Sequence, residues 1–84
     1  MPKIEIYTKQ TCPYCVRAKQ LLDQKNVKYI EIRVDENPKD LEMMLLRAEG
    51  RRTVPQIFIN DRGIGGCDDL YALEQAKKLD TLLG

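Results

Sequence analysis

The sequence contains no histidine, and only three of its 84 residues are cysteine. Without histidine, acid–base chemistry near neutral pH has to come from a thiol, a carboxylate or a lysine with a shifted pKa. Also missing is any run of about 18 consecutive apolar residues, so we expect no membrane span. The first residues do not have the pattern of a secretory signal peptide. We therefore expect a cytoplasmic protein without a membrane partner.

Cysteine is too scarce to hold a small chain together. A chain of this length buries only about 60 to 65% of its unfolded surface, so we expect one domain, residues 1–84. Small secreted domains usually carry several disulfides, but here the number of cysteines is odd and two of them are only three residues apart. This pattern favours a reducing compartment.

A large excess of charge of either sign is also absent. Fourteen Lys and Arg residues against 13 Asp and Glu residues give a formal net charge of +1. Proteins that neutralise many nucleic-acid phosphates need a clear excess of basic residues. We therefore expect no nucleic-acid partner.

The apolar pattern predicts alternating strands and helices. Residues 3–8 alternate as a half-buried strand does, whereas Cys15, Ala18, Leu21 and Leu22 recur with helical spacing. Asn37-Pro38 is typical of an N-cap and the first position of a helix. The predicted elements are a strand at 3–8, a helix from Pro13 to about Lys25, a strand at 27–34, a helix from Pro38 to Gly50, a strand at 56–59, a return strand at Ile64, a helix from a capping Asp68 to Lys77 and a short turn at 79–83.

This order, β-α-β-α-β-β-α, predicts an α/β fold with a four-stranded mixed sheet and flanking helices. The first two strands should be parallel, because a helix joins them by a right-handed crossover. The last two should be antiparallel, because only a short turn joins them.

The stretch Thr11 to Cys15 contains two thiols between a predicted strand and a predicted helix. A disulfide between Cys12 and Cys15 would close a very small loop and stabilise the fold only slightly, which suits exchange. Cys12 lies at the helix N-terminus, where unpaired N–H groups and the helix dipole favour a thiolate. Cys15 lies one turn further along and should be shielded. We therefore expect Cys12 to attack disulfides.

Two other interpretations of the thiol pair are weaker. A structural zinc site normally needs four Cys or His ligands, and only Cys67 remains, so we expect no metal. Inert thiols at this spacing by chance are also conceivable, but a Cys-x-x-Cys between strand and helix is typical of a redox motif.

Four segments together resemble a dithiol glutaredoxin of the compact bacterial type, and the resemblance covers essentially the whole chain. They are Lys9, Cys12-Pro13-Tyr14-Cys15, Thr53-Val54-Pro55-Gln56 and Gly65-Gly66-Cys67-Asp68-Asp69-Leu70. The resemblance implies a thioredoxin fold and glutathione as the reducing co-substrate. It also implies an oxidoreductase that reduces protein disulfides and protein–glutathione mixed disulfides.

The resemblance assigns different roles to the two thiols. Cys12 attacks the disulfide or the glutathione mixed disulfide, and Cys15 resolves the intermediate in the dithiol route alone. In the monothiol route, a second glutathione releases the first from Cys12.

The resemblance also implies a glutathione site. A cis bond before Pro55 would place the Val54 backbone against the peptide like an added β-strand. N–H groups at Gly66 and Cys67 would hold the γ-glutamyl carboxylate. The implied glutathione-binding residues are Lys9, Tyr14, Thr53, Val54, Pro55, Gly66, Cys67, Asp68 and Asp69.

Several of these side chains have a more specific expected part. Asp68 or Asp69 would meet the ammonium of glutathione, and Lys9 its glycine carboxylate. Arg47 or Arg52 could also pair with the glycine carboxylate, but we expect both to be solvated surface charges.

The implied partners are glutathione and disulfide-bonded or glutathionylated proteins, among which ribonucleotide reductase is one candidate. We expect the chain to be a monomer. One alternative is a thioredoxin-like reductant supplied by a flavoprotein reductase. Another is an iron–sulfur carrier in which two chains each donate Cys12 and glutathione completes the ligands. Pro13 counts against the carrier, since the family uses mostly single-thiol motifs or a smaller residue there.

Overall fold

The computed structural model describes residues 2–84 and contains one four-stranded mixed sheet of order β2-β1-β3-β4. Its elements are β1 (Ile4–Thr8), α1 (Pro13–Gln24), β2 (Ile30–Arg33), α2 (Pro38–Arg47), β3 (Gln56–Ile59), β4 (Arg62–Gly65), α3 (Cys67–Gln75) and α4 (Leu79–Leu83). β1 pairs parallel with β2 and antiparallel with β3, and β3 pairs antiparallel with β4. The predicted order and strand directions are confirmed.

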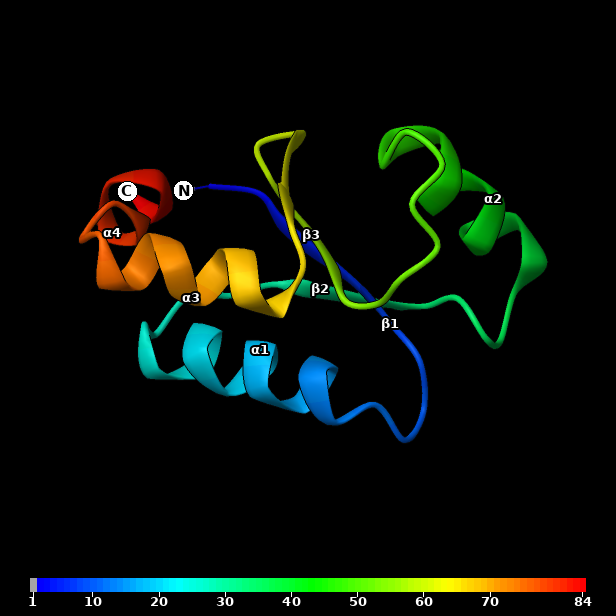
Figure 1. Cartoon of the computed structure of the whole chain (residues 1–84), viewed down its shortest axis with the longest axis horizontal. Coiled ribbons are helices and arrows are strands. Elements are labelled where there is room, and N and C mark those ends of the chain that lie inside the picture. The colour runs from blue at the N-terminus through cyan, green and yellow to red at the C-terminus, as the bar shows by residue number, and fades with distance from the viewer. Residues whose placement is uncertain (1) are drawn as a thin grey trace.

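Helices cover both faces of the sheet. α1 and α3 lie side by side on one face, and α2 lies on the other (Figure 1). Because strand side chains alternate between faces, Ile4 and Ile6 of β1 join the core under α1 and α3, whereas Tyr7 packs with Met44 of α2. Every residue of β1 is therefore buried. The prediction of a half-buried β1 is wrong, because this strand is central in the sheet.

Arg47 of α2 pairs with Glu5, one of the polar residues that β1 buries. Its Nη2 lies 2.9 Å from Glu5 Oε1, and its Nη1 donates to the Tyr7 hydroxyl at 3.0 Å. The guanidinium also lies 4.1 Å from the ring centroid of Phe58. The hydrogen bond that Arg47 donates to Glu5 is the main cause that raises the pKa of Arg47. The expectation that Arg47 is a solvated surface charge is wrong, since the sheet supplies it with a buried carboxylate.

Local capping sets the helix ends. Asn37 Oδ1 accepts the Lys39 N–H at 2.9 Å, which confirms the predicted N-cap of α2. The helix ends at Arg47, three residues before the predicted stop at Gly50. Glu49 adopts the left-handed conformation, with φ 57°, and the Gly50 N–H donates to the Leu45 carbonyl at 2.7 Å. This is the hydrogen bond of a Schellman cap, in which a residue in the left-handed conformation terminates the helix.

Strand β2 is shorter than predicted. It begins at Ile30, whose pairing with Glu5 opens the ladder, instead of at Val27. Val27 and Tyr29 pack against the core from the loop before it. Ile30 itself is 55% exposed, because β2 is an edge strand. A β-branched composition suits both this loop and the strand, so it did not locate the boundary.

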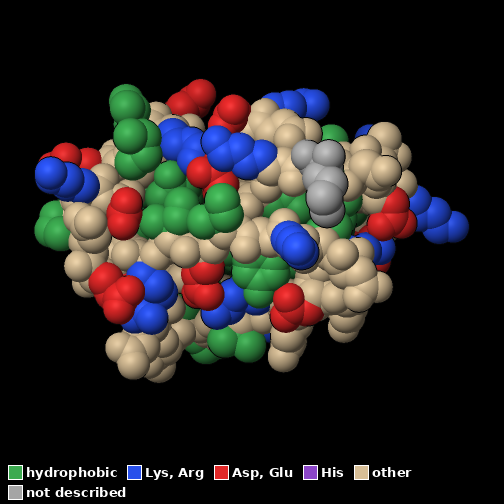
Figure 2. Space-filling view, turned by 180° about the vertical axis from the view of Figure 1, so that it is seen from behind, with side chains coloured by type: hydrophobic (Ala, Val, Ile, Leu, Met, Phe, Trp, Pro, Cys, Tyr) green, Lys and Arg blue, Asp and Glu red, His purple; other side chains and the backbone are tan. Residues whose placement is uncertain are grey.

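Charges of both signs are interspersed over the surface. Seen from behind in Figure 2, Lys and Arg side chains alternate with Asp and Glu side chains around small apolar areas. Several are paired; Lys25, for example, lies 2.7 Å from Glu74 and 2.9 Å from Asp80 and joins the end of α1 to α3 and α4. Within residues 2–84, every helix is too short or too polar to span a bilayer.

Leu22 and Leu46 allow a matched test of the core. Leu22 of α1 is fully buried against the sheet, whereas Leu46 of α2 is 76% exposed. We expect Leu22→Ala to lower the free energy of unfolding by about 2 to 5 kcal/mol, since it removes buried methyl groups and leaves a cavity. Leu46→Ala should change it by less than about 0.5 kcal/mol. Urea denaturation measures both, and equal losses would contradict the packing described.

Glu31 should make stability depend on pH. Its Oε2 accepts from Thr8 Oγ1 at 2.7 Å and from Lys19 Nζ at 3.0 Å, and the Thr8 hydrogen bond foremost lowers the pKa of Glu31. A carboxyl whose pKa falls on folding stabilises the protein above its unfolded pKa of about 4.3. That contribution is lost as the pH falls through the folded pKa. We therefore expect Glu31→Gln to be less stable than wild type at pH 7.

Urea denaturation at pH values from 7 down to 2 measures this difference. The free energy of unfolding should decrease less steeply with acidification in Glu31→Gln than in wild type. Parallel pH curves for the two proteins would contradict it.

Candidate active site

Cys12 caps the N-terminus of α1. It has extended φ and ψ angles of −123° and 102°, and the Cys15 N–H donates to Cys12 Sγ at 3.3 Å. The sulfur thus takes the place of the side-chain oxygen of an ordinary N-cap residue. Pro13 follows at the first helical position, as predicted. The unpaired N–H groups and the dipole of this helix end favour negative charge on the Cys12 sulfur.

The loop before Cys12 is held by the end of β2. The Gln10 N–H donates to Asp35 Oδ2 at 3.2 Å, and Arg33 pairs with Asp35 through two hydrogen bonds of 2.8 and 2.9 Å. The Arg33 hydrogen bond lowers the pKa of Asp35, which keeps this carboxylate charged. Thr11, which follows Gln10 in this loop, has φ 56°, a conformation that β-branched residues seldom adopt. Arg33 and Asp35 were not among the predicted site residues, because their role depends on a contact between segments 25 residues apart.

The two thiols differ in exposure. Cys12 is partly exposed, whereas Cys15 is buried and 1% exposed. Burial, above all, together with the hydrogen bond with Cys12, raises the pKa of Cys15 to about 12. Cys15 is therefore a neutral thiol in the reduced protein at neutral pH. The expected assignment of Cys12 as the accessible thiol and Cys15 as the shielded one matches this geometry.

A groove of about 340 Å³ lies beside Cys12. The Cys12 thiol lies 3.9 Å from the Val54 carbonyl oxygen, toward which it points as a weak donor. Of the nine predicted glutathione-binding residues, all except Lys9 line this groove. Arg51, which was not predicted, completes the lining. The lining residues are Tyr14, Arg51, Thr53, Val54, Pro55, Gly66, Cys67, Asp68 and Asp69.

The basic residue that lines the groove is Arg51, whereas the sequence predicted Lys9. Lys9 is exposed at the end of β1 but does not line the groove. Arg51 is 55% exposed and lies 3.9 Å from Asp69 Oδ2. The sequence signal for Arg51 was its position two residues before Thr53, and its neighbour Arg52 was considered instead.

The loop at one wall of the groove is braced from within. The Val54–Pro55 peptide bond is cis, as the resemblance implied. Gln56 is buried, and its Nε2 donates to the Thr53 carbonyl at 2.9 Å and to Thr53 Oγ1 at 3.1 Å. The side chain of Gln56 therefore fixes the backbone that carries Thr53 and Val54.

The opposite wall is the start of α3. The Gly66 N–H donates to Asp69 Oδ2 at 2.9 Å, so Gly66 is the N-cap and the predicted cap at Asp68 is two residues too late. Gly65 has φ +110°, and a Cβ there would collide with the same Asp69 oxygen. Only glycine leaves room for this carboxylate to turn back. Asp69 is therefore engaged by its own helix, and Asp68 is exposed at the groove.

Cys67 is the third thiol and lies in the groove wall. It is 4% exposed, and burial raises its pKa, against the opposing charge of Arg17. A buried thiol kept neutral is a poor nucleophile. The side chain of Cys67 therefore contributes packing to the core.

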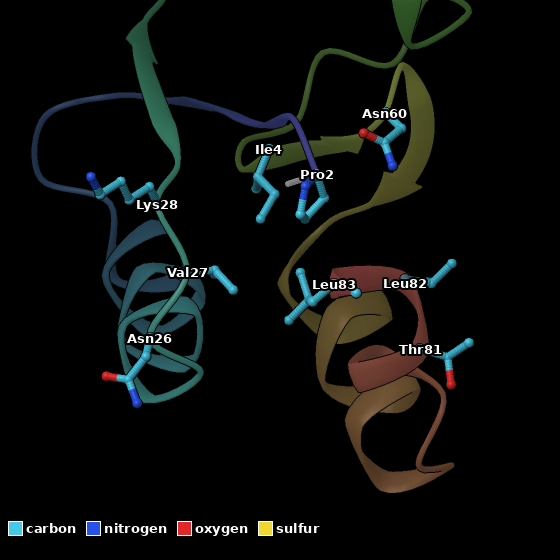
Figure 3. A pocket seen from close by; sticks show the side chains of 10 residues that line it. Pro2, Ile4, Asn26, Val27, Lys28, Asn60, Thr81, Leu82 and Leu83 are labelled. Carbon is cyan, nitrogen blue, oxygen red and sulfur yellow. The ribbon is translucent and has the colours of Figure 1, made fainter.

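A larger cavity lies at the other end of the sheet. It has a volume of about 800 Å³ and is bordered by Pro2, by the loop after α1 and by α4 (Figure 3). Ile4, at the start of β1, points into it, whereas Cys12 follows the far end of the same strand. Its lining residues include no thiol or carboxylate side chain. The smaller groove beside Cys12 is therefore the candidate for redox chemistry.

Comparison with known proteins identifies the family. The glutaredoxin family model matches residues 4–64. Glutaredoxin 3 of Escherichia coli strain K12 is 57% identical over 83 residues, which cover 99% of each chain. A probable glutaredoxin of Synechocystis sp. is 60% identical over 81 residues, covering 96% of this chain and 74% of the relative.

Solved structures give the same result. A buckwheat glutaredoxin–glutathione complex superposes with a TM-score of 0.87 at 34% identity, covering 98% of this chain and 76% of that one. The glutaredoxin of Brucella melitensis has a TM-score of 0.83 at 51% identity, covering 96% and 87%. The thioredoxin fold and the bacterial resemblance are thereby confirmed. The chain belongs to the glutaredoxin family and is a glutathione-dependent oxidoreductase.

Proposed function

We propose that this glutaredoxin reduces protein–glutathione mixed disulfides and protein disulfides, with Cys12 as nucleophile and Cys15 as conditional resolving thiol. The observation that carries the proposal is the position of Cys12 Sγ, which caps α1 and lies 3.9 Å from the Val54 carbonyl at the end of the groove. The attacking sulfur is therefore stabilised as an anion at the place where a disulfide would enter.

The monothiol route needs Cys12 alone. The Cys12 thiolate attacks the glutathione sulfur of a mixed disulfide, which forms a Cys12–glutathione disulfide and releases the substrate as a thiolate. A second glutathione thiolate then attacks the same glutathione sulfur. Oxidised glutathione leaves, and Cys12 departs as the thiolate that α1 stabilises.

The dithiol route also uses Cys15. Cys12 attacks a protein disulfide, releases one substrate thiolate and stays bound to the other sulfur. The Cys15 thiolate then attacks Cys12 Sγ, which forms the Cys12–Cys15 disulfide and releases the second substrate thiolate. Two glutathione molecules, one after the other, return the pair to the dithiol form. Two electrons pass to the substrate in each cycle.

The groove has the size and polarity to hold glutathione. Its volume of about 340 Å³ lies in the range of small-ligand pockets. The Val54 backbone would pair with the cysteinyl portion like an added strand. N–H groups at the start of α3 would hold the γ-glutamyl carboxylate, and Asp68 would meet the ammonium. The buckwheat relative was solved in complex with glutathione, which supports this assignment.

Basic side chains would complete the glutathione site. Arg51 lies in the groove lining, and Lys9 is exposed at the end of β1, so both are proposed partners for the glycine carboxylate. Tyr14, 55% exposed between the thiols, would shape the entrance. These contacts are exposed and individually weak, which suits a co-substrate that must leave after each turn.

We further propose that residues 1–84 act as one domain and a monomer in the cytoplasm. The chain has only three cysteines, two of them three residues apart, which suits a reducing compartment. The partners would be glutathione and glutathionylated or disulfide-bonded proteins. The thioredoxin-like and iron–sulfur alternatives gain no support from the described site.

The thiol roles can be tested with two substrates. We expect Cys12→Ser to reduce neither a small glutathione mixed disulfide nor a protein disulfide above the uncatalysed rate, since it removes the nucleophile. Cys15→Ser should keep the first activity and lose most of the second. Both are measured by coupling the oxidised glutathione to its reductase. Equal loss of both activities in Cys15→Ser would overturn the assigned roles.

The groove assignment predicts a selective effect of Asp68→Asn. We expect the KM for glutathione to rise about 1.5- to 5-fold with kcat unchanged, because an exposed ion pair contributes about 0.2 to 1 kcal/mol. N-acetylated glutathione lacks the ammonium, so Asp68→Asn should not alter its KM. Asp40→Asn, which changes an acidic residue in the first turn of α2, is the matched control. If Asp68→Asn raised the KM for glutathione and for N-acetylated glutathione equally, the proposed ion pair would be wrong.

A further inference from the structure

A polar cluster lies on the sheet face beneath α1, close to the buried thiol. Thr8 is fully buried, and its hydroxyl donates to Glu31 Oε2 at 2.7 Å. The same oxygen accepts from Lys19 Nζ at 3.0 Å. Glu31 pairs with Ile6 in the parallel ladder, which places its side chain on the α1 face along with Thr8. One carboxylate oxygen therefore ties the Lys19 ammonium to the sheet.

This tether holds a positive charge one helical turn from Cys15. Lys19 follows Cys15 by four residues on α1, so the two side chains lie on one face of the helix. A free lysine side chain would extend into solvent, where its charge is screened. Lys19 instead is 28% exposed and points toward the sheet through its bond to Glu31. A buried hydroxyl and a carboxylate therefore orient this ammonium.

The groups acting on the Cys15 thiol fall into two sets. Its hydrogen bond with Cys12 and the charge of Cys12 favour the neutral thiol, as burial does. The Lys9 backbone N–H, as a donor, and the charge of Lys19 favour the thiolate. When Cys12 enters a mixed disulfide, its charge and its thiol hydrogen are lost. The two influences that favour the Cys15 thiolate then remain.

We propose that Lys19, oriented by Glu31 and Thr8, is a positioning residue of the resolving step, whose charge favours the Cys15 thiolate once Cys12 carries a mixed disulfide. This inference rests on the proposed role of Cys15 as resolving thiol. Cys15 would thus remain inert in the reduced enzyme and become a nucleophile when there is an intermediate to resolve.

The resolving step balances without another reactant. Cys15 gives its proton to solvent, and its thiolate attacks Cys12 Sγ. The Cys12–Cys15 bond forms as the bond from Cys12 to the substrate sulfur breaks, and the substrate sulfur leaves as a thiolate that takes up a proton from solvent. Lys19 neither gains nor loses a proton in this step.

The first test measures the thiolate fraction of Cys15 without any turnover. Cys12→Ala removes the charge and the thiol hydrogen of Cys12, as a mixed disulfide does. In this background, the alkylation rate of Cys15 by iodoacetamide is followed from pH 7 to 9.5 by mass spectrometry of the peptide that contains it. We expect Lys19→Gln to lower this rate about threefold to tenfold, the effect of losing a nearby charge that is partly exposed to solvent.

Two control variants separate charge from structure. Lys19→Arg retains the charge and should alkylate as the Cys12→Ala parent does. Lys39→Gln removes a lysine at the start of α2 and should also leave the rate unchanged. Rates within twofold for Lys19→Gln and the parent at every pH would overturn the proposal, as would equal decreases in Lys19→Gln and Lys19→Arg.

The second test follows the resolving step itself with Cys12 present. Reduced enzyme is mixed with oxidised glutathione, and the conversion of the Cys12–glutathione species to the internal disulfide is timed by acid quench and mass spectrometry. Lys19→Gln should slow this conversion about threefold to tenfold below pH 8, because less of the Cys15 thiol is then ionised. Reduction of a small glutathione mixed disulfide should be unaffected.

The two proposals fail in different ways. If Cys15→Ser kept full activity on protein disulfides, the resolving role would be wrong, whatever the alkylation rates showed. If Cys15→Ser lost that activity but Lys19→Gln resolved at the wild-type rate, the role of Lys19 alone would be wrong.

Discussion

The hydrogen bond from the Cys15 N–H to Cys12 Sγ is the interaction on which the active site depends. It makes a sulfur the N-cap of α1, so the start of the helix and the accessible thiol coincide in one residue. Helix N–H groups favour negative charge on this sulfur, which the proposed attack and departure of Cys12 both require. The same geometry places Cys15 one turn inside the helix, where burial keeps it a thiol. One cap therefore gives two identical side chains different chemistry.

Polar residues inside the fold serve to hold this junction in place. β1 leads into the active-site loop and is buried on both faces, so its polar side chains need partners. Arg47 pairs with Glu5 on one face, and Glu31 accepts from Thr8 on the other. In the part of the chain that the structure describes, no buried side-chain nitrogen or oxygen lacks a hydrogen-bond partner. The strand end that presents Cys12 is thus fixed from both sides of the sheet.

Sequence patterns predicted the positions of helices and strands better than the burial and the partners of individual side chains. Asn37 with Pro38 located the start of α2, because capping is a local interaction. The cap of α3 was assigned to Asp68, although Gly66 takes that place, because Asp69 reaches back to the Gly66 N–H only if residue 65 has no side chain. Burial of Glu5 and pairing of Arg47 were missed for another reason. They depend on which strand is central and on where α2 crosses the sheet. The periodicity of apolar residues along the chain predicts neither of these.

The sequence by itself determined the alternation of strands and helices, the position of the thiol pair and the family resemblance, since these depend on spacing within short segments. Only the tertiary structure decided which side chains surround the thiols. The groove joins Tyr14 to segments around residues 53 and 67, with Arg51 inside it and Lys9 outside. Glu31 likewise binds Lys19 only because β2 brings this carboxylate beside Thr8 and α1. Such contacts form between residues tens of positions apart, so their geometry follows from chain packing and not from any local pattern.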